Sequence, residues 1–287
     1  MPWIILKILL VLVLAPVAGG LLSGLDRKLS ARMQRRKGPP LLQPFYDVWK
    51  LFEKEASTVN QMTRFFISFS LFFTALTVVF FFLGVDLLLC IFAYTLAAMF
   101  FVIAGYSSHS PYSFVGTGRE LLQIMAYEPM ILLTAFGYYM ATGSFRTSAA
   151  AALDSPIILQ LPFIFLGFLY VLTLKLRKSP FDLSMSHHGH QEIVKGITTE
   201  LTGSCLAMVE ITHWYETIFS LGFVYLFFNF AAPWSPVLAV CVCLFTFFME
   251  TFIDNVFARA KWELMLKSSW IVTAVLGGIN LVVLTYL

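Results

Sequence analysis

The chain has 287 residues, of which 59% are hydrophobic and 12% are charged, and its formal net charge is +3. Soluble domains carry about 25% charged residues, so this composition excludes an ordinary soluble enzyme and indicates a protein that crosses a lipid bilayer several times. The small positive charge is therefore a signal of membrane topology, and we expect no binding of nucleic acid.

Apolar segments of about 20 residues are each long enough to cross the hydrocarbon core of a bilayer. The expected fold class is all-α: a polytopic membrane protein with eight transmembrane helices and long cytoplasmic loops, forming a single integral membrane domain over residues 1–287. The expected spans lie at about 2–24, 64–83, 86–105, 121–142, 156–176, 206–230, 235–257 and 267–287. The expected cytoplasmic loops lie at about 25–63, 106–120, 177–205 and 258–266.

Basic residues are distributed unevenly between the two sides of this arrangement. Seventeen of the 19 Lys and Arg residues fall in the first, third, fifth and seventh connections or at the span ends that border them, and the two exceptions are Lys7 and Arg146. Because cytoplasmic loops carry an excess of Lys and Arg, these four connections are predicted to face the cytoplasm. A multi-pass protein of the cell membrane with both termini outside is therefore expected.

Several acidic residues lie within the expected spans, where an ionised carboxylate costs several kcal/mol. They are Glu128, Glu210, Glu216, Glu250 and Asp254, and Glu192 and Glu200 stand at the cytoplasmic end of the sixth span. Their positions predict a polar funnel that opens to the cytoplasm and carries protons, although no exit near the outer face is visible. Alternatively, each acid pairs with a nearby base, as Asp254 could with Arg259 or Lys261, and has a structural role.

The connection after the fifth span contains His187, His188 and His190, with Glu192 close by. Adjacent histidines rarely converge on one ion, and residues 177–204 contain no cysteine to complete a set of ligands. Subunit contacts or a pH-responsive loop explain these histidines better than a metal site. Cys241 and Cys243 would face different directions on one helix and make a poor pair of ligands. We therefore expect no metal site.

Two long motifs carry a resemblance to a known family. The basic run Arg32–Pro40, followed by Leu42-Gln43-Pro44 and Lys50–Glu55, resembles the first cytoplasmic loop of the H-type (heel) membrane subunits of NADH–quinone oxidoreductase, respiratory complex I. Ser179–Leu183 and Glu200–Gly203 resemble the second signature loop of that family. The resemblance extends over essentially the whole chain.

The chain departs from the quinone-reducing members after the second motif. Ser184–Gln191 brings three histidines where those members have an acidic stretch, and this pattern together with Val209–Glu216 resembles the B-type membrane subunits of energy-converting (Ech-type) nickel–iron hydrogenases. The resemblance implies an acidic channel and a surface that docks the peripheral arm of the complex. The channel residues would be Glu128, Glu192, Glu200 and Glu210, and the docking residues Arg35, Arg36, Lys37 and Asp182.

This resemblance implies a membrane-anchor and coupling subunit of a ferredoxin-dependent hydrogenase, linking proton reduction or H2 oxidation to translocation of H+ or Na+. The chain itself would be non-catalytic and hold no redox centre. The expected partners are soluble large and small hydrogenase subunits and iron–sulfur subunits on the cytoplasmic face, holding the Ni–Fe centre and iron–sulfur clusters, and an antiporter-like membrane subunit. Two alternatives stay open: the quinone-site heel subunit of a complex I-type NADH, F420 or ferredoxin–quinone oxidoreductase, and a stand-alone ion transporter.

Overall fold

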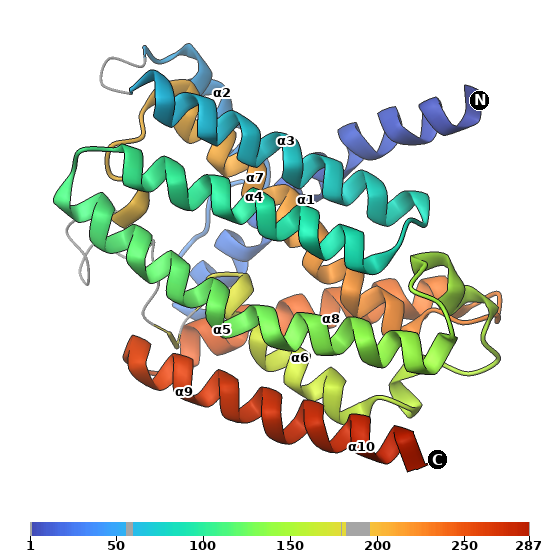
Figure 1. Ribbon diagram of the computed structural model, residues 1–287. Helices are drawn as coiled ribbons and strands as arrows, with labels where there is room; N and C mark the ends of the chain where they lie inside the picture. Colours follow the sequence, from blue (N-terminus) through green and yellow to red (C-terminus); the bar gives the residue numbers. More distant parts are fainter. Residues whose placement is uncertain (1, 56–59, 179, 182–195, 287) are drawn as a thin grey trace. The chain divides into compact units, whose positions relative to one another are not determined.

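The computed structural model describes residues 2–55, 60–178, 180–181 and 196–286, and the regular elements in these ranges are helices (Figure 1). The α-helices are α1 (Pro2–Met33), α2 (Gln43–Glu53), α3 (Gln61–Leu83), α4 (Leu87–Ser107), α5 (Pro111–Thr142), α6 (Pro162–Lys175), α7 (Gly203–Phe228), α8 (Ser235–Val256), α9 (Trp262–Val272) and α10 (Gly278–Tyr286). Short 3-10 turns cover Thr147–Ala152, Ile157–Leu159 and Gly196–Thr198. The prediction of an all-α protein is confirmed.

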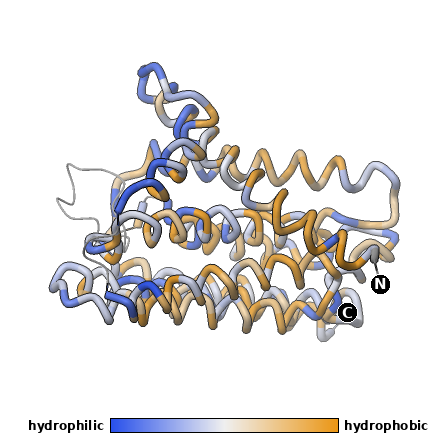
Figure 2. Tube along the Cα trace, turned by 90° about the horizontal axis from the view of Figure 1, so that it is seen from above, coloured by the Kyte–Doolittle hydropathy of each residue, from blue (hydrophilic) through white to orange (hydrophobic). Residues whose placement is uncertain are grey.

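Six helices of the described chain are long and apolar enough to cross a membrane. They are α1, α3, α4, α5, α8 and the helix formed by α9 and α10, which a π-turn at Thr273–Gly277 joins. Along these helices the apolar residues form long continuous stretches (Figure 2). α6 is apolar but has only 14 residues. α7 has 26 residues, about 39 Å of helix, and contains Glu210, His213 and Glu216 within its apolar sequence.

Two helices extend well beyond the spans expected from hydropathy. α1 continues to Met33, so it includes part of the segment expected as a loop. α5 begins at Pro111, and most of the loop expected at 106–120 is therefore helical. Proline suits the first turn of a helix, where its missing N–H removes no internal hydrogen bond. Because α5 begins this early, Arg119 and Glu120 lie inside a helix and not in a connection.

The end of α1 explains why the sequence does not reveal where the helix stops. Arg35 has φ 56°, its N–H donates to the Arg32 carbonyl at 3.0 Å, and the Arg36 N–H donates to the Ala31 carbonyl at 2.7 Å. This is the hydrogen-bond pattern of a Schellman motif, whose left-handed residue is usually glycine. With arginine in that position, the usual glycine stop signal is absent.

The chain divides into two compact units. Unit 1 comprises Met1–Val79, Ala93–Ile124 and Asp182–Ile218, and unit 2 comprises Phe80–Phe92, Met125–Phe181 and Phe219–Leu287. The prediction of a single membrane domain over the whole chain stays a prediction.

In unit 1, Trp214 of α7 anchors both α1 and the amphipathic helix α2. Its ring lies 5.1 Å from that of Phe45, and a Cβ on Gly19 would lie 2.4 Å from the Trp214 carbonyl oxygen. Glycine is thus required at this position, because the backbones of α1 and α7 approach too closely for a side chain. Arg27 of α1 also pairs with Asp47 of α2 at 2.6 Å. Burial raises the pKa of Asp47, but the hydrogen bonds from Arg27 and Gln43 outweigh it and hold this pKa below its usual value.

In unit 2, three polar links fasten α6 along its length to the last part of the chain. Asn280 of α10 accepts hydrogen bonds from the Phe163 and Ile164 N–H groups at 2.9 and 3.3 Å. Tyr170 donates to Ser268 of α9 at 2.6 Å, and the Ala260 N–H donates to the Pro180 carbonyl at 2.5 Å. These links fix the short helix α6 at its beginning, middle and end.

Asn280→Ala is expected to lower the stability of the protein by about 1–2 kcal/mol, because two N–H groups at the beginning of α6 lose their acceptor. Leu161, which precedes α6, has no side-chain cap to replace it. Thermal unfolding in detergent micelles measures the change. Thr285→Ala is the matched control, since that hydroxyl is exposed and bonds only within its own helix. Equal unfolding temperatures for the two variants would contradict this role of Asn280.

Candidate functional site

Three polar side chains of unit 1 contact one another between α4 and α7: Tyr94, His213 and Glu216. Glu216 is 9% exposed, and its Oε2 lies 3.0 Å from Nδ1 of His213 on the same helix. The hydroxyl of Tyr94 on α4 donates to Oε1 of Glu216 at 3.3 Å. The Phe101 ring meets the His213 ring edge-on at 6.2 Å between centroids. A carboxylate, an imidazole and a phenol are thus in contact in an apolar interior, where they can hold and pass a proton.

Three further acids predicted from the sequence belong to unit 1: Glu210 on α7, Glu200 in the turn that precedes α7, and Glu120 on α5. Glu210 is three residues before His213 on α7, so the two are neighbours on one face of the helix. Glu210 and Glu200 are half-buried, whereas Glu120 of α5 is buried. The segment before Glu200 packs closely on α5, because a Cβ on Gly116 would lie 2.3 Å from the Ile197 nitrogen.

Unit 2 contains a second polar cluster, at the ends of α6 and α8. Asp254 of α8 pairs with Lys178 at 3.7 Å between Oδ2 and Nζ. Glu250, one turn earlier on α8, is 3% exposed and interacts electrostatically with both Lys178 and Asp254. The acids predicted to line a funnel are therefore divided between the two units, and Asp254 pairs with a lysine that the sequence did not suggest.

Lys175 is the second buried lysine of unit 2. It is 6% exposed, and its Nζ lies 4.9 Å from the ring centroid of Phe219 and 5.7 Å from that of Tyr127. An ammonium over the face of an aromatic ring is stabilised by the ring quadrupole. Glu128 directly follows Tyr127 on α5 and is half-buried in the same unit, and α5 continues through Pro129 without ending.

The predicted docking residues Arg35, Arg36 and Lys37 are exposed and follow α1 directly. Arg36 hydrogen-bonds the side chain of Gln34. The neighbouring helix α2 exposes large aromatic side chains as well, with Tyr46 at 55% and Trp49 at 69%. A basic turn beside an aromatic helix face is a suitable surface for a protein partner.

Some predicted residues lie outside the described residues. They are Glu192, Asp182, His187, His188 and His190. Within the ranges that the structure covers, no group of three or more His, Cys, Asp or Glu residues is placed to hold a metal ion.

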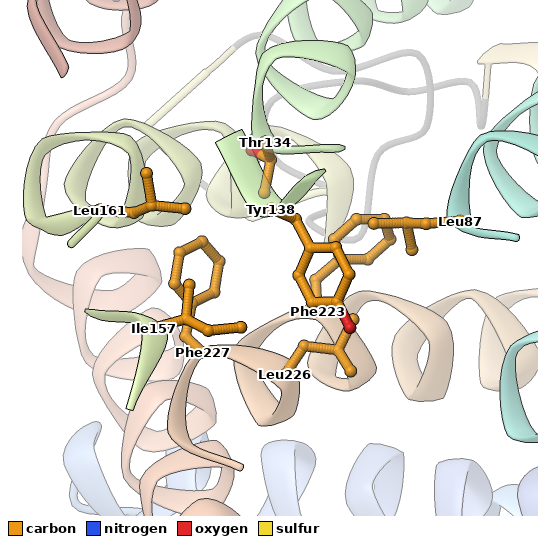
Figure 3. A pocket seen from close by; sticks show the side chains of 8 residues that line it. All are labelled: Leu87, Thr134, Tyr138, Ile157, Leu161, Phe223, Leu226 and Phe227. Carbon is orange, nitrogen blue, oxygen red and sulfur yellow. The ribbon is translucent and has the colours of Figure 1, made fainter. Parts of the chain in front are cut away.

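Unit 2 also contains a small cavity with an almost entirely apolar lining, shown in Figure 3. Its volume is about 10 Å³, about the size of one water molecule. The residues that line it are Leu87, Thr134, Tyr138, Ile157, Leu161, Phe223, Leu226 and Phe227. The cavity is too small and too apolar for a substrate or cofactor, so we do not consider it part of the functional site.

Sequence reasoning did not anticipate the participation of Tyr94, Lys175 and Lys178. Lys175 lies at the end of an apolar span and Lys178 just after it, where the sequence indicates a topology signal, yet both are buried. Their position at the end of the span was visible, but no local pattern separates a buried lysine from one at the membrane surface. Tyr94 has no signal of its own in the sequence, because a tyrosine within an apolar helix such as α4 fits ordinary hydrophobic packing as well.

Comparison with known proteins identifies the family. A family model described as NADH dehydrogenase matches residues 6–285. The chain is 26% identical to hydrogenase-4 component C of Escherichia coli (strain K12), over 88% of this chain and 87% of that protein. It is 30% identical to NADH-ubiquinone oxidoreductase chain 1 of Patiria pectinifera, over 84% of this chain and 80% of that protein.

A solved structure shows the same fold. A chain of the membrane-bound sulfane sulfur reductase, an archaeal respiratory membrane complex, superposes with a TM-score of 0.86 and 24% sequence identity. The match covers 98% of this chain and 99% of that one. Together with the family match over almost the whole length, these similarities show that the chain belongs to the NADH dehydrogenase family, as an integral multi-pass membrane subunit of a complex I-like oxidoreductase.

Proposed function

We propose that the chain is the membrane-anchor and coupling subunit of an energy-converting hydrogenase that links proton reduction, or H2 oxidation, to translocation of H+ or Na+. The similarity to hydrogenase-4 component C over most of both chains supports this choice within the family. The sequence after Asp182, with three histidines in place of an acidic stretch, supports it as well.

The observation that carries the coupling role is the pair of buried polar clusters. In unit 1, Tyr94 and His213 both contact the carboxylate of Glu216. In unit 2, Asp254 forms an ion pair with Lys178, and Glu250 interacts electrostatically with the same lysine. Ionisable groups are costly inside a membrane protein and are retained where an ion or a proton must move. These clusters are consistent with a chain that handles protons and leaves the redox chemistry to its partners.

We assign the residues as follows. The residues proposed for the ion path are Glu128, Glu192, Glu200, Glu210, Glu216, Glu250 and Asp254. The residues proposed to dock the soluble arm are Arg35, Arg36, Lys37 and Asp182. The partners proposed are soluble hydrogenase and iron–sulfur subunits, which would hold the Ni–Fe centre and the clusters, and an antiporter-like membrane subunit.

A quinone-site subunit of a complex I-type oxidoreductase is the second candidate. The 30% identity to an NADH-ubiquinone oxidoreductase chain 1 favours it. Membership of the family argues against a stand-alone transporter, because the similar proteins are named as components, chains or subunits of larger enzymes.

Purification of the complex through a tag on this chain tests the choice between hydrogenase and quinone reductase. The proposal predicts co-purifying hydrogenase and iron–sulfur subunits, with nickel in the preparation measured by mass spectrometry. A nickel-free complex with bound quinone would contradict the proposal and support the second candidate.

We further propose eight membrane spans, counting α6 and α7, with both termini outside. Labelling of single cysteines at two exposed positions is the test: with the four native cysteines replaced, Arg36→Cys is expected to react only from the cytoplasm and Arg146→Cys only from outside. Arg36 lies in the first of the four connections that are rich in Lys and Arg, and such connections face the cytoplasm. If both positions react with an impermeant reagent from the same side, the proposed topology is wrong.

A further inference from the structure

Two acidic side chains of α8 in unit 2 are brought onto one face of the helix by their spacing. Glu250 and Asp254 are four residues apart, and Glu250 lies about 9 Å along the helix from its last residue. Glu250 is 3% exposed, and among the residues that the structure describes its Oε2 has no hydrogen-bond partner. A buried polar atom without a partner is destabilising, and more so when it is charged, so a missing ligand is the simplest explanation.

The position of Lys178 opposite these acids is fixed by the local backbone. α6 ends in a second Schellman motif: Arg177 has φ 53°, and the Lys178 N–H donates to the Thr173 carbonyl at 2.9 Å. The bond from the Ala260 N–H to the Pro180 carbonyl then ties this turn to the segment that follows α8. Lys178 is 8% exposed, and its ammonium is 3.7 Å from Asp254.

The charges of this cluster do not balance when all three groups are ionised. Two carboxylates face one ammonium, which leaves one negative charge in a buried place, where an uncompensated charge is strongly destabilising. The nearby Lys175 is held over the rings of Phe219 and Tyr127. Further charged groups on neighbouring segments are Arg177 after α6, Glu128 on α5 and Arg259 after α8, all half-buried. The segment that begins α9 adds three exposed ones, Lys261, Glu263 and Lys267.

We propose that Glu250, Asp254 and Lys178 form a binding site for one monovalent cation, either a proton or Na+, with Oε2 of Glu250 as the ligand atom that receives it. Carboxylate oxygens can bind either cation. Na+ is a hard cation that prefers oxygen ligands, and a proton converts the carboxylate into a neutral acid. Lys178 supplies the first positive charge of the site and the bound cation supplies the second. The purpose of the site rests on the coupling function proposed above. Binding of the cation to Glu250 does not, because it can be measured in a complex that is not turning over.

Infrared difference spectroscopy of the purified complex measures the occupied site directly, because a protonated carboxyl has a C=O band that a carboxylate lacks. In buffer without Na+ at neutral pH, the complex is expected to show a protonated carboxyl band that is lost in Glu250→Gln. Glu263→Gln is the matched control, since Glu263 is exposed in the first turn of α9, and it is expected to keep the band. If Na+ but not choline removes the band, the ligand is exchangeable Na+; if Na+ has no effect, the ligand is a proton.

Lys178→Gln tests the charge balance separately. Without the ammonium the two carboxylates need one more positive charge, so the titration midpoint of the band is expected to rise by about 1–3 pH units. An unchanged midpoint in a folded Lys178→Gln complex would overturn the role of Lys178. Identical spectra for the wild type and Glu250→Gln at every pH, with and without Na+, would overturn the site.

The binding site and its purpose can fail independently. If the spectra show no cation at Glu250 while the complex still moves ions, the site is wrong and the coupling function stands. If the cation binds but Glu250→Gln leaves ion movement unchanged, the site exists without the proposed purpose.

Discussion

Glu210→Gln, and separately Glu128→Gln, is expected to abolish ferredoxin-driven ion movement in sealed vesicles while hydrogen evolution from an artificial electron donor survives. Glutamine keeps the size of the side chain and removes the proton that it can exchange. A positioned acid or base contributes roughly 10²–10⁴-fold to the rate of a proton transfer, so ion uptake is expected to fall by about 100-fold or more. One variant lies in each unit, Glu210 beside His213 on α7 and Glu128 on α5.

Glu263→Gln is again the control, because it removes an acid from the same chain at an exposed position. Ion uptake is followed with a pH-sensitive dye or with radioactive Na+, and hydrogen by gas chromatography of the same samples. Normal ion uptake in the Gln variants would show that these acids have a structural role. Loss of both activities with the soluble arm still attached would place them in the supply of protons to the catalytic centre, contrary to the coupling role proposed here.

The double variant Arg35→Gly with Arg36→Ala is expected to release the soluble arm while this chain remains in the membrane. Residues at the centre of an interface each contribute about 2 kcal/mol or more, so the loss of two is expected to weaken binding about 1000-fold. Glycine is chosen for Arg35 because the backbone there is left-handed, with φ 56°, and glycine adopts this conformation without strain. The variant therefore removes both guanidinium groups and also relieves the backbone strain at the end of α1.

Arg32→Ala is the matched control, since Arg32 is exposed one turn earlier on α1, within the same basic segment. Sedimentation of membranes after a salt wash separates attached from released subunits, and immunoblotting quantifies both. Full retention of the soluble arm by the double variant would contradict docking at this turn. A loss in the Arg32→Ala membranes of the same size would point to a general electrostatic attraction instead, since an exposed charge near anionic lipid is worth about 1 kcal/mol.

The apolar segments were the part of the fold most open to prediction, because hydrophobic length alone identifies membrane helices. The expected spans at 64–83, 86–105 and 235–257 differ from α3, α4 and α8 by three residues or fewer at each end. The polar ends of α1 and α5 were missed, because hydropathy cannot follow a helix that leaves the apolar region. The fifth expected span at 156–176 is shorter in the structure, where α6 begins at Pro162 after a separate 3-10 turn.

The sequence predicted which acidic residues belong to the candidate site, but not which residues they contact. The acids stood out in the sequence because carboxylates are rare in apolar segments. Their partners depend on contacts between distant parts of the chain: Tyr94 reaches Glu216 across 122 positions, and Lys178 reaches Asp254 only because α6 and α8 are tied together at their ends. Such contacts follow from helix packing, which no local pattern records.

Reconstitution of the tagged wild-type complex into sealed vesicles tests the central claim most directly, namely that this chain couples hydrogen chemistry to ion movement. With reduced ferredoxin outside, on the side of the soluble arm, the account predicts hydrogen evolution together with accumulation of H+ or Na+ in the vesicle lumen, and an ionophore for the transported ion should abolish the accumulation but not the hydrogen. Hydrogen evolution without any ion accumulation in tight vesicles, or a complex that reduces quinone and evolves no hydrogen, would contradict it.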